Sequence, residues 1–179
     1  MRLIICLGLM MSLAHDLQSQ DYFTRSGHVW FFSSTPAEDI TAHNYQVLSR
    51  VSSDGQVQFA MLMKGFKFEK ALMEEHFNEK YVESSQYPKA GFKGKVVDFS
   101  QVDLSQAGTY PVKVVGEMTI HGVTKSVEAS GQFMVAGGQL RAEALFQLRP
   151  EDYGITLFSA KIAEVLDIHV DMAYELQNP

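Results

Sequence analysis

Histidines and carboxylates are the side chains of this sequence that could bind a metal ion. Glu75 and His76 stand four and three residues before Glu79, so a helix would place all three side chains close together. A zinc site needs such converging ligands, but this spacing is also common on solvated helix faces. His121 falls at a predicted turn, and His169 alternates with aspartates on an outward strand face. We therefore predict no metal site. The other histidines after residue 20 are His28 and His43.

Nucleophilic and acid–base catalysis have no recognisable motif in this chain. The Gly-x-Ser-x-Gly elbow of hydrolases and the glycine-rich phosphate-binding loops are both absent from the sequence. Acidic residues occur in adjacent pairs, whose side chains point apart on a strand and do not face each other on a helix. The sequence predicts a protein that is not an enzyme and needs no cofactor, although distant carboxylates could still converge. The adjacent pairs are Glu38–Asp39, Glu74–Glu75 and Glu151–Asp152.

Charge and cysteine content narrow the class of partner. The chain has 179 residues, a formal net charge of −6 and a single cysteine, Cys6. An acidic chain without a basic cluster is poorly suited to nucleic acid, whose phosphates require Lys and Arg. Without a second cysteine no internal disulfide can form, so stability has to come from a hydrophobic core.

Residues 1–20 are typical of a secretory signal peptide. Met1 and Arg2 give a short positive start, Leu3 to Leu13 form an apolar run, and we expect cleavage near Gln20. The run is shorter than the ~20 apolar residues that span a bilayer, and an N-terminal anchor is the alternative interpretation. We predict a signal peptide over 1–20 and one domain over 21–179, periplasmic or secreted, with no stable membrane insertion.

Alternation of apolar and polar residues dominates the rest of the sequence and predicts β-strands with one buried face. The strongest example is the segment 116–127, where two alternating runs flank a His121–Gly122 step typical of a hairpin turn. One segment, 68–82, instead has helical spacing and predicts an amphipathic helix. The predicted strands cover 22–34, 39–52, 56–66, 92–97, 109–121, 123–136, 139–149 and 163–176.

Eight such strands predict an all-β fold, an eight-stranded antiparallel barrel with the helix capping one end. Small residues on the predicted inward faces have two interpretations. They either leave an open lumen or match the taper of a filled core. The helix likewise either lies across the mouth or packs outside the barrel. The small residues are Gly94, Gly116, Ala142 and Ala144.

Three blocks of sequence resemble the YceI-like family of exported, lipocalin-like proteins. The first runs from Glu75-His76-Phe77 through Tyr87-Pro88 and Phe92 to Gly94, and the second is Gly116 to Val127. The third is Asp152-Tyr153-Gly154-Ile155. The front of the chain lacks the long first strands with a conspicuous histidine that many members show, which predicts a shorter barrel at that end. The resemblance implies an eight-stranded barrel that holds a long apolar molecule, such as a polyisoprenoid or a fatty-acid-like lipid.

We accordingly expect an apolar small molecule as the partner, for sequestration or transport in the cell envelope. A ligand-free envelope scaffold with a filled barrel is the main alternative, and a lipid hydrolase or isomerase is a more distant one. The oligomeric state is open, and a dimer is compatible with the sequence. The predicted ligand-binding residues are Phe59, Met61, Met63, Phe68, Leu72, Phe77, Tyr81, Phe92, Val114, Met118, Phe146, Ile168 and Met172.

Overall fold

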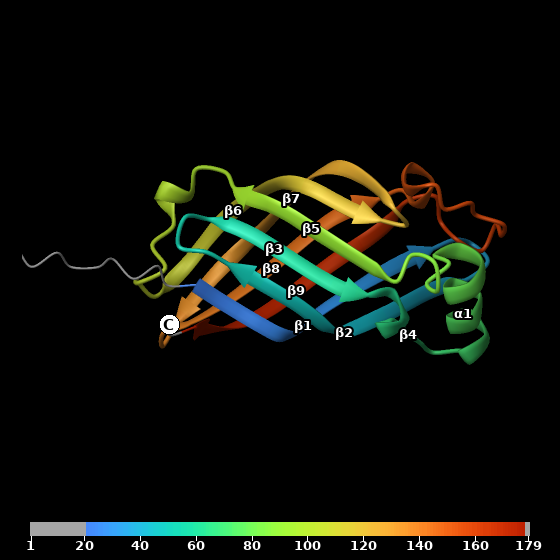
Figure 1. Ribbon diagram of the computed structural model, residues 1–179, viewed down its shortest axis with the longest axis horizontal. Coiled ribbons are helices and arrows are strands. Elements are labelled where there is room, and N and C mark those ends of the chain that lie inside the picture. The colour runs from blue at the N-terminus through green and yellow to red at the C-terminus, as the bar shows by residue number, and fades with distance from the viewer. Residues whose placement is uncertain (1–20, 178–179) are drawn as a thin grey trace, which may run out of the picture.

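The computed structural model describes residues 21–177, which form an elongated antiparallel barrel with a helix at one end (Figure 1). The predicted signal peptide, residues 1–20, lies outside the described residues, so the domain boundary stays a prediction. The strands are β1 (Asp21–Ser34), β2 (Asp39–Val51), β3 (Gln56–Leu62), β4 (Lys67–Phe68), β5 (Lys89–Val96), β6 (Gly108–Ile120), β7 (Val123–Ala136), β8 (Gln139–Leu148) and β9 (Leu166–Gln177).

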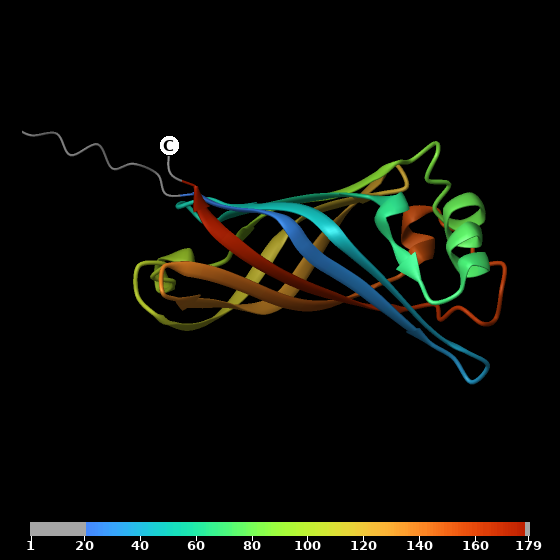
Figure 2. The same ribbon diagram turned by 90° about the horizontal axis from the view of Figure 1, so that it is seen from below.

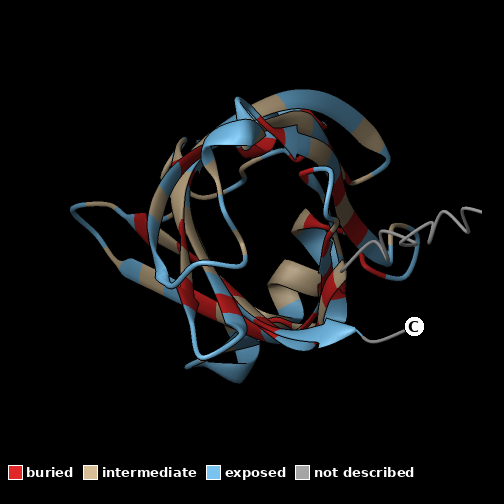
Figure 3. Cartoon of the chain, turned by 90° about the vertical axis from the view of Figure 1, so that its left-hand side faces the viewer, coloured by how far each residue is buried: buried red, intermediate tan, exposed pale blue. Residues whose placement is uncertain are grey.

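Closure of the sheet comes from β1, which pairs with β9 on one side and with β2 on the other. The remaining order is β9-β8-β7-β6-β5-β3-β2, all antiparallel, so the eight long strands have no free edge. The two-residue β4 pairs only with β2. Figure 3, a view along the barrel, shows the strands as a closed ring. The predicted fold, an eight-stranded antiparallel barrel, is confirmed.

The β6–β7 hairpin turns where the sequence predicts it. Ile120 pairs with Val123, which leaves a two-residue loop, and both loop residues have positive φ, 50° for His121 and 74° for Gly122. Two positive φ values define a type I′ turn, whose twist matches that of the flanking strands. Glycine adopts this conformation without steric cost, whereas His121 is held in it by contacts described below.

The first two strands are long, which corrects the expectation of a shorter barrel at the front. β1 has 14 residues and β2 has 13, and they contain His28 and His43. Register shifts in the β1–β2 pairing indicate one extra residue in each strand, after Thr24 in β1 and after Asn44 in β2. Such bulges reverse the inward and outward alternation. Alternation is therefore harder to recognise in these strands than in those with regular pairing.

The helical segment is shorter than the predicted range of 68–82. It consists of α1 (Ala71–His76) and a π-helical turn, η2 (Phe77–Tyr81). Phe68 lies outside it because the backbone of β4 is paired with Ala42 and His43 of β2. Figure 2 shows α1 at one end of the barrel rather than on its outer wall. Within residues 21–177 no helix has the length and apolar character needed to cross a membrane.

Three single turns of 3₁₀-helix complete the structure. They are η1 (Met63–Gly65), η3 (Phe99–Gln101) and η4 (Pro150–Tyr153). η1 and η4 follow β3 and β8 at the end of the barrel that carries α1, and η3 lies at the other end (Figure 1). We call the end with α1 the mouth and the other the closed end.

Candidate functional site

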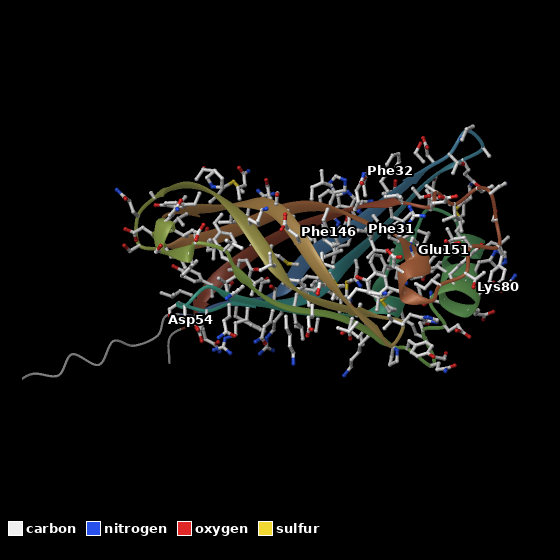
Figure 4. All side chains as sticks on the ribbon, turned by 90° about the horizontal axis from the view of Figure 1, so that it is seen from above. Phe31, Phe32, Asp54, Lys80, Phe146 and Glu151 are labelled. Atoms are coloured by element: carbon white, nitrogen blue, oxygen red, sulfur yellow. The ribbon has the colours of Figure 1, made fainter. Side chains whose placement is uncertain are left out.

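A cavity of about 220 Å³ lies inside the barrel at the mouth. Its wall consists of inward side chains from the strands, and α1, η2 and the segment after η4 contribute the rest. Nearly all of its lining is apolar, including Val29, Phe31 and Phe146. Figure 4 shows Phe31 directed into the barrel and its neighbour Phe32 directed away from it. The arrangement offers shape and apolar surface rather than reactive groups.

The helical segment is attached to the barrel by an aromatic cluster. The ring of Phe77 lies 5.9 Å from that of Phe31, 5.5 Å from Phe66 and 5.0 Å from Phe68, measured between centroids. Offset and edge-on contacts at these distances stabilise aromatic pairs beyond their buried area. Phe31 and Phe66 are almost fully buried, and all four rings line the cavity. The cluster therefore holds the helical segment over the mouth, as one of the two sequence interpretations requires.

Nine of the thirteen predicted ligand-binding residues line this cavity. They come from β3, η1, β4, η2, β6, β8 and β9, and the two from β3 stand at alternating positions. Whether they contact a ligand stays a prediction. These nine residues are Phe59, Met61, Met63, Phe68, Phe77, Tyr81, Met118, Phe146 and Ile168.

The other four predicted residues lie elsewhere. Leu72 is 60% exposed, because the short helix turns this side chain away from the barrel. Phe92 and Met172 do point inward, but they are packed among other core side chains below the cavity. Val114 is partly buried against the same core, farther along β6 from the mouth. Alternation along a strand therefore shows which side chains point into the barrel. It does not show how far along the barrel axis the lumen is filled by core side chains.

The closed end of the barrel is filled by the protein itself. A Cβ atom added to Gly94 or to Gly116 would lie 2.5 or 2.7 Å from Cζ of Phe92, so this ring covers both glycines. One added to Gly27 would lie 2.1 Å from Sδ of Met172. The small residues thus do not leave the lumen open at these positions. The filled-core interpretation therefore holds for Gly94 and Gly116. The open part of the lumen, at the mouth, is lined by none of the four small residues named above.

Sequence reasoning missed part of the cavity wall. Val29 and Phe31 belong to an apolar run, His28 to Phe32, in which parity gives no contrast between the two faces. Ile155, Leu157 and Ile162 lie in an irregular segment without periodicity. Only the pairing of β1 with a strand of regular alternation could have indicated which residues of β1 point inward.

Polar groups are confined to the mouth of the cavity. Glu38, His76 and Lys161 contribute to its lining there. The carboxylate of Glu38 accepts a hydrogen bond of 2.6 Å from Lys70, and this bond is the main cause that lowers the pKa of Glu38. The hydroxyl of Ser33 accepts a hydrogen bond from the backbone N–H of Ala163, which attaches the segment after η4 to β1. A polar rim around an apolar interior suits a molecule with a long tail and one polar end.

The other histidines lie outside the cavity. Tyr45, His28, Trp30 and His169 form a row of stacked rings on the outer wall of β2, β1 and β9, with centroids 4.1, 4.5 and 4.7 Å apart. His28 also hydrogen-bonds His43 at 3.0 Å, and burial, with the charge of His43 next in importance, lowers the pKa of His28. In the described residues, no three potential ligands of the His, Cys, Asp or Glu type gather around a common point. The stack is best understood as a cross-strand packing feature.

Residues 22–174 match the YceI-like domain. The chain belongs to the YceI-like family. The match extends from β1 into β9, and the resemblance found in the three sequence blocks is confirmed. Among curated proteins, none matches the sequence significantly.

Solved structures show the same fold at low sequence identity. A polyisoprenoid binding domain from Saccharophagus degradans, implicated in plant cell wall breakdown, superimposes with a TM-score of 0.74 at 12% identity, covering 88% of this chain and 98% of its own. BcnA of Burkholderia cenocepacia gives 0.70 at 12%, covering 83% and 96%. The Campylobacter jejuni YCEI protein gives 0.59 at 12%, covering 88% and 85%. At these identities the likeness establishes the fold of this YceI-like chain.

The three blocks that carry the YceI-like resemblance meet at the mouth. His121, in the β6–β7 turn, contacts the carboxylate of Glu83 through Nε2 at 2.9 Å and the carbonyl oxygen of Tyr153 through Nδ1 at 3.2 Å. The ring of Tyr87 lies 4.2 Å from the imidazole. These contacts hold His121 at its positive φ and join the turn to the loop after η2 and to η4. In this YceI-like protein the blocks therefore build the end of the barrel that contains the cavity.

Proposed function

We propose that this protein binds a long apolar molecule, a polyisoprenoid or a fatty-acid-like lipid, and sequesters or carries it in the cell envelope. The observation that supports the proposal most is the apolar cavity at the mouth, bounded by the aromatic cluster and by inward strand residues. A further support is that one structural neighbour is named as a polyisoprenoid binding domain. The envelope location rests on residues 1–20, whose composition is that of a signal peptide.

The driving force for binding is the removal of apolar surface from water. It contributes about 25 cal/mol for each Å² buried, for the ligand and for the cavity wall alike. An extended ligand loses chain entropy when it is confined, and this loss reduces the affinity. A rigid or branched chain, such as an isoprenoid, loses less than a saturated acyl chain of the same length.

The cavity is small for a long ligand. Its volume of about 220 Å³ lies below the roughly 300–1,000 Å³ typical of small-molecule sites. Four methionines, Met61, Met63, Met73 and Met118, are part of the lining, and their unbranched side chains can adopt new rotamers around a guest. A long tail would thus be admitted by rearrangement of these side chains.

A binding role also fits the chemistry of the lining better than catalysis. The titratable side chains that line the cavity within residues 21–177 are Glu38, His76, Tyr81 and Lys161. Glu38 is already engaged by two lysines, at 2.6 Å from Lys70 and 3.6 Å from Lys161. A carboxylate with a lowered pKa and two cationic partners is a poor general base for an apolar substrate.

The test is to purify the full chain from its own host without detergent and to record a native mass spectrum. We expect a co-purifying apolar mass, and solvent extraction would identify it. A ligand-free protein that also fails to bind the neutral probe N-phenyl-1-naphthylamine would contradict the proposal and favour the scaffold alternative. Change of an added lipid with time would instead favour an enzyme.

A matched pair of variants locates the site. Ile168→Phe adds volume to the cavity wall on β9, whereas Leu145→Phe adds the same ring type to the outer face, where Leu145 is 52% exposed. We expect the first variant to lose the co-purified mass and the probe, and the second to keep both. Thermal melting of both variants shows whether overpacking has unfolded the barrel.

A further inference from the structure

Three segments that are distant in sequence meet around one carboxylate at the mouth. Glu38 lies in the loop between β1 and β2, Lys70 directly precedes α1, and Lys161 lies in the segment after η4. Figure 2 shows the tip of the β1–β2 hairpin, α1 and this segment at the same end of the barrel. Glu38 and Lys161 also line the cavity, so the charged cluster is continuous with its apolar interior.

The two lysines are not equally engaged. Nζ of Lys70 lies 2.6 Å from Oε1 of Glu38, a charge-assisted hydrogen bond, whereas Nζ of Lys161 lies 3.6 Å from Oε2 of Glu38. The side chain of Glu38 is only 18% exposed, but that of Lys161 is 63% exposed. One carboxylate thus faces two ammonium groups, and Lys161 makes the longer and weaker of the two contacts.

Lys161 is the exposed cation of this cluster. Glu38 is shared between Lys70 and Lys161, and Glu69 also acts on Lys70, so Lys161 is the lysine whose charge is least compensated. In the same segment, Glu164 is engaged by Arg149 at 3.5 Å. The rim of the cavity therefore presents a cation that is accessible both to solvent and to a guest in the lumen.

We propose that the ligand carries an anionic headgroup, a carboxylate or a phosphate, which binds Lys161 at the mouth while the tail occupies the cavity. This inference rests on the proposed function and specifies its ligand class. A charged headgroup cannot enter the apolar interior without a large desolvation cost, so it stays at the rim. There it meets Lys161, and the second oxygen of Glu38 is released to water.

Binding of ligand pairs that differ only in the headgroup tests the inference. The full chain, extracted free of lipid, is loaded with N-phenyl-1-naphthylamine, and the probe is displaced by oleate or oleyl alcohol and by farnesyl phosphate or farnesol. We expect each anionic member to bind about five- to tenfold more tightly than its neutral partner, as for one partly exposed charge-assisted contact. The stronger of the two anions distinguishes an acyl from an isoprenoid source.

Variants at the rim change this preference in opposite directions. Lys161→Gln removes the cation and is expected to abolish the preference for the anionic member of each pair. Glu38→Gln removes the competing carboxylate and is expected to increase the preference. Lys95→Gln, an exposed position on the outer face of β5, is the control and should leave the preference unchanged.

The outcomes separate the two proposals. Equal affinity for charged and neutral members in the unmodified protein overturns the headgroup inference and leaves the apolar site intact. An equal loss for both members in Lys161→Gln overturns it too, because it would show that Lys161 supports the segment after η4 rather than the headgroup. If no member displaces the probe, the proposed function itself fails.

Discussion

Phe92 and Gly116 lie on adjacent strands, and the ring of Phe92 occupies the space above the glycine. A Cβ atom added to Gly116 would lie 2.7 Å from Cζ of Phe92 and 2.4 Å from both Cα of Gly94 and the carbonyl oxygen of Lys93. The glycine thus permits a large aromatic ring to lie against the barrel wall over β5 and β6, in the part of the lumen that side chains fill. A small residue on an inward face here accommodates a neighbour rather than a guest.

Gly116→Ala should therefore destabilise the barrel. The added methyl group meets backbone atoms, which cannot rotate away as a side chain can, so we expect a loss of roughly 1–3 kcal/mol in the free energy of unfolding. Urea denaturation measures it. Ser126→Ala, at an exposed position of the partner strand β7, is the control and should stay within about 0.5 kcal/mol of the parent. A stability for Gly116→Ala equal to that of the control would show that the space is not tightly filled.

The free energy of unfolding of the barrel should decrease at alkaline pH because Tyr174 ionises. Its hydroxyl is bonded to Ser49 at 2.8 Å in the closed end, and burial raises the pKa of Tyr174 to about 12 from 10.0. The phenolate forms more readily in the unfolded chain, so the stabilisation is complete below pH 10 and is lost as pH rises toward 12. Two pKa units correspond to about 3 kcal/mol.

The variant Tyr174→Phe tests this dependence directly. It removes the titrating group, so its free energy of unfolding should fall less steeply between pH 10 and 12 than that of the parent. A smaller decline should persist, because burial also raises the pKa values of Tyr22 and Tyr153. Identical slopes for parent and variant would show that Tyr174 ionises as easily in the folded state as in the unfolded one.

His28 should titrate below its ordinary pKa of 6.5. Burial and the charge of His43 lower the pKa of His28, while Asp171 partly opposes them. Imidazole NMR spectra over a pH series give its midpoint. His43→Phe should raise the midpoint, and Asp171→Asn should lower it further.

The lowered pKa of His28 should also make the stability of the protein depend on pH. A histidine with a lowered pKa stays neutral in the folded state, so its contribution is present above pH 6.5 and is lost as pH falls through the folded pKa. Thermal melting of the parent and of His28→Phe at pH 7 and at pH 5 should show that only the parent loses this part of its stability. An unchanged difference between the two proteins would contradict this.

Most strands and the β6–β7 turn could be predicted because regular alternation and a His-Gly step are local signals. Closure into a barrel is not local, and its prediction rested on the strand count and on the family resemblance. The filled half of the lumen could not, because it depends on whether Phe92 lies over Gly94 and Gly116, which belong to different strands. Phe31 was missed because both neighbours along β1 are large and apolar. The charged rim was missed for a related reason, since Glu38, Lys70 and Lys161 come together only when three loops meet.

Phe77 should control how fast a ligand leaves the mouth. Its ring joins the helical segment to Phe31, Phe66 and Phe68, so Phe77→Ala removes the contact that the three rings share. We expect faster release of N-phenyl-1-naphthylamine, measured by stopped-flow dilution, with a smaller effect on its association rate. Leu72→Ala is the control, since that side chain is 60% exposed on the same helical segment. Equal release rates in both variants would show that ligands leave by a route that does not require movement of α1.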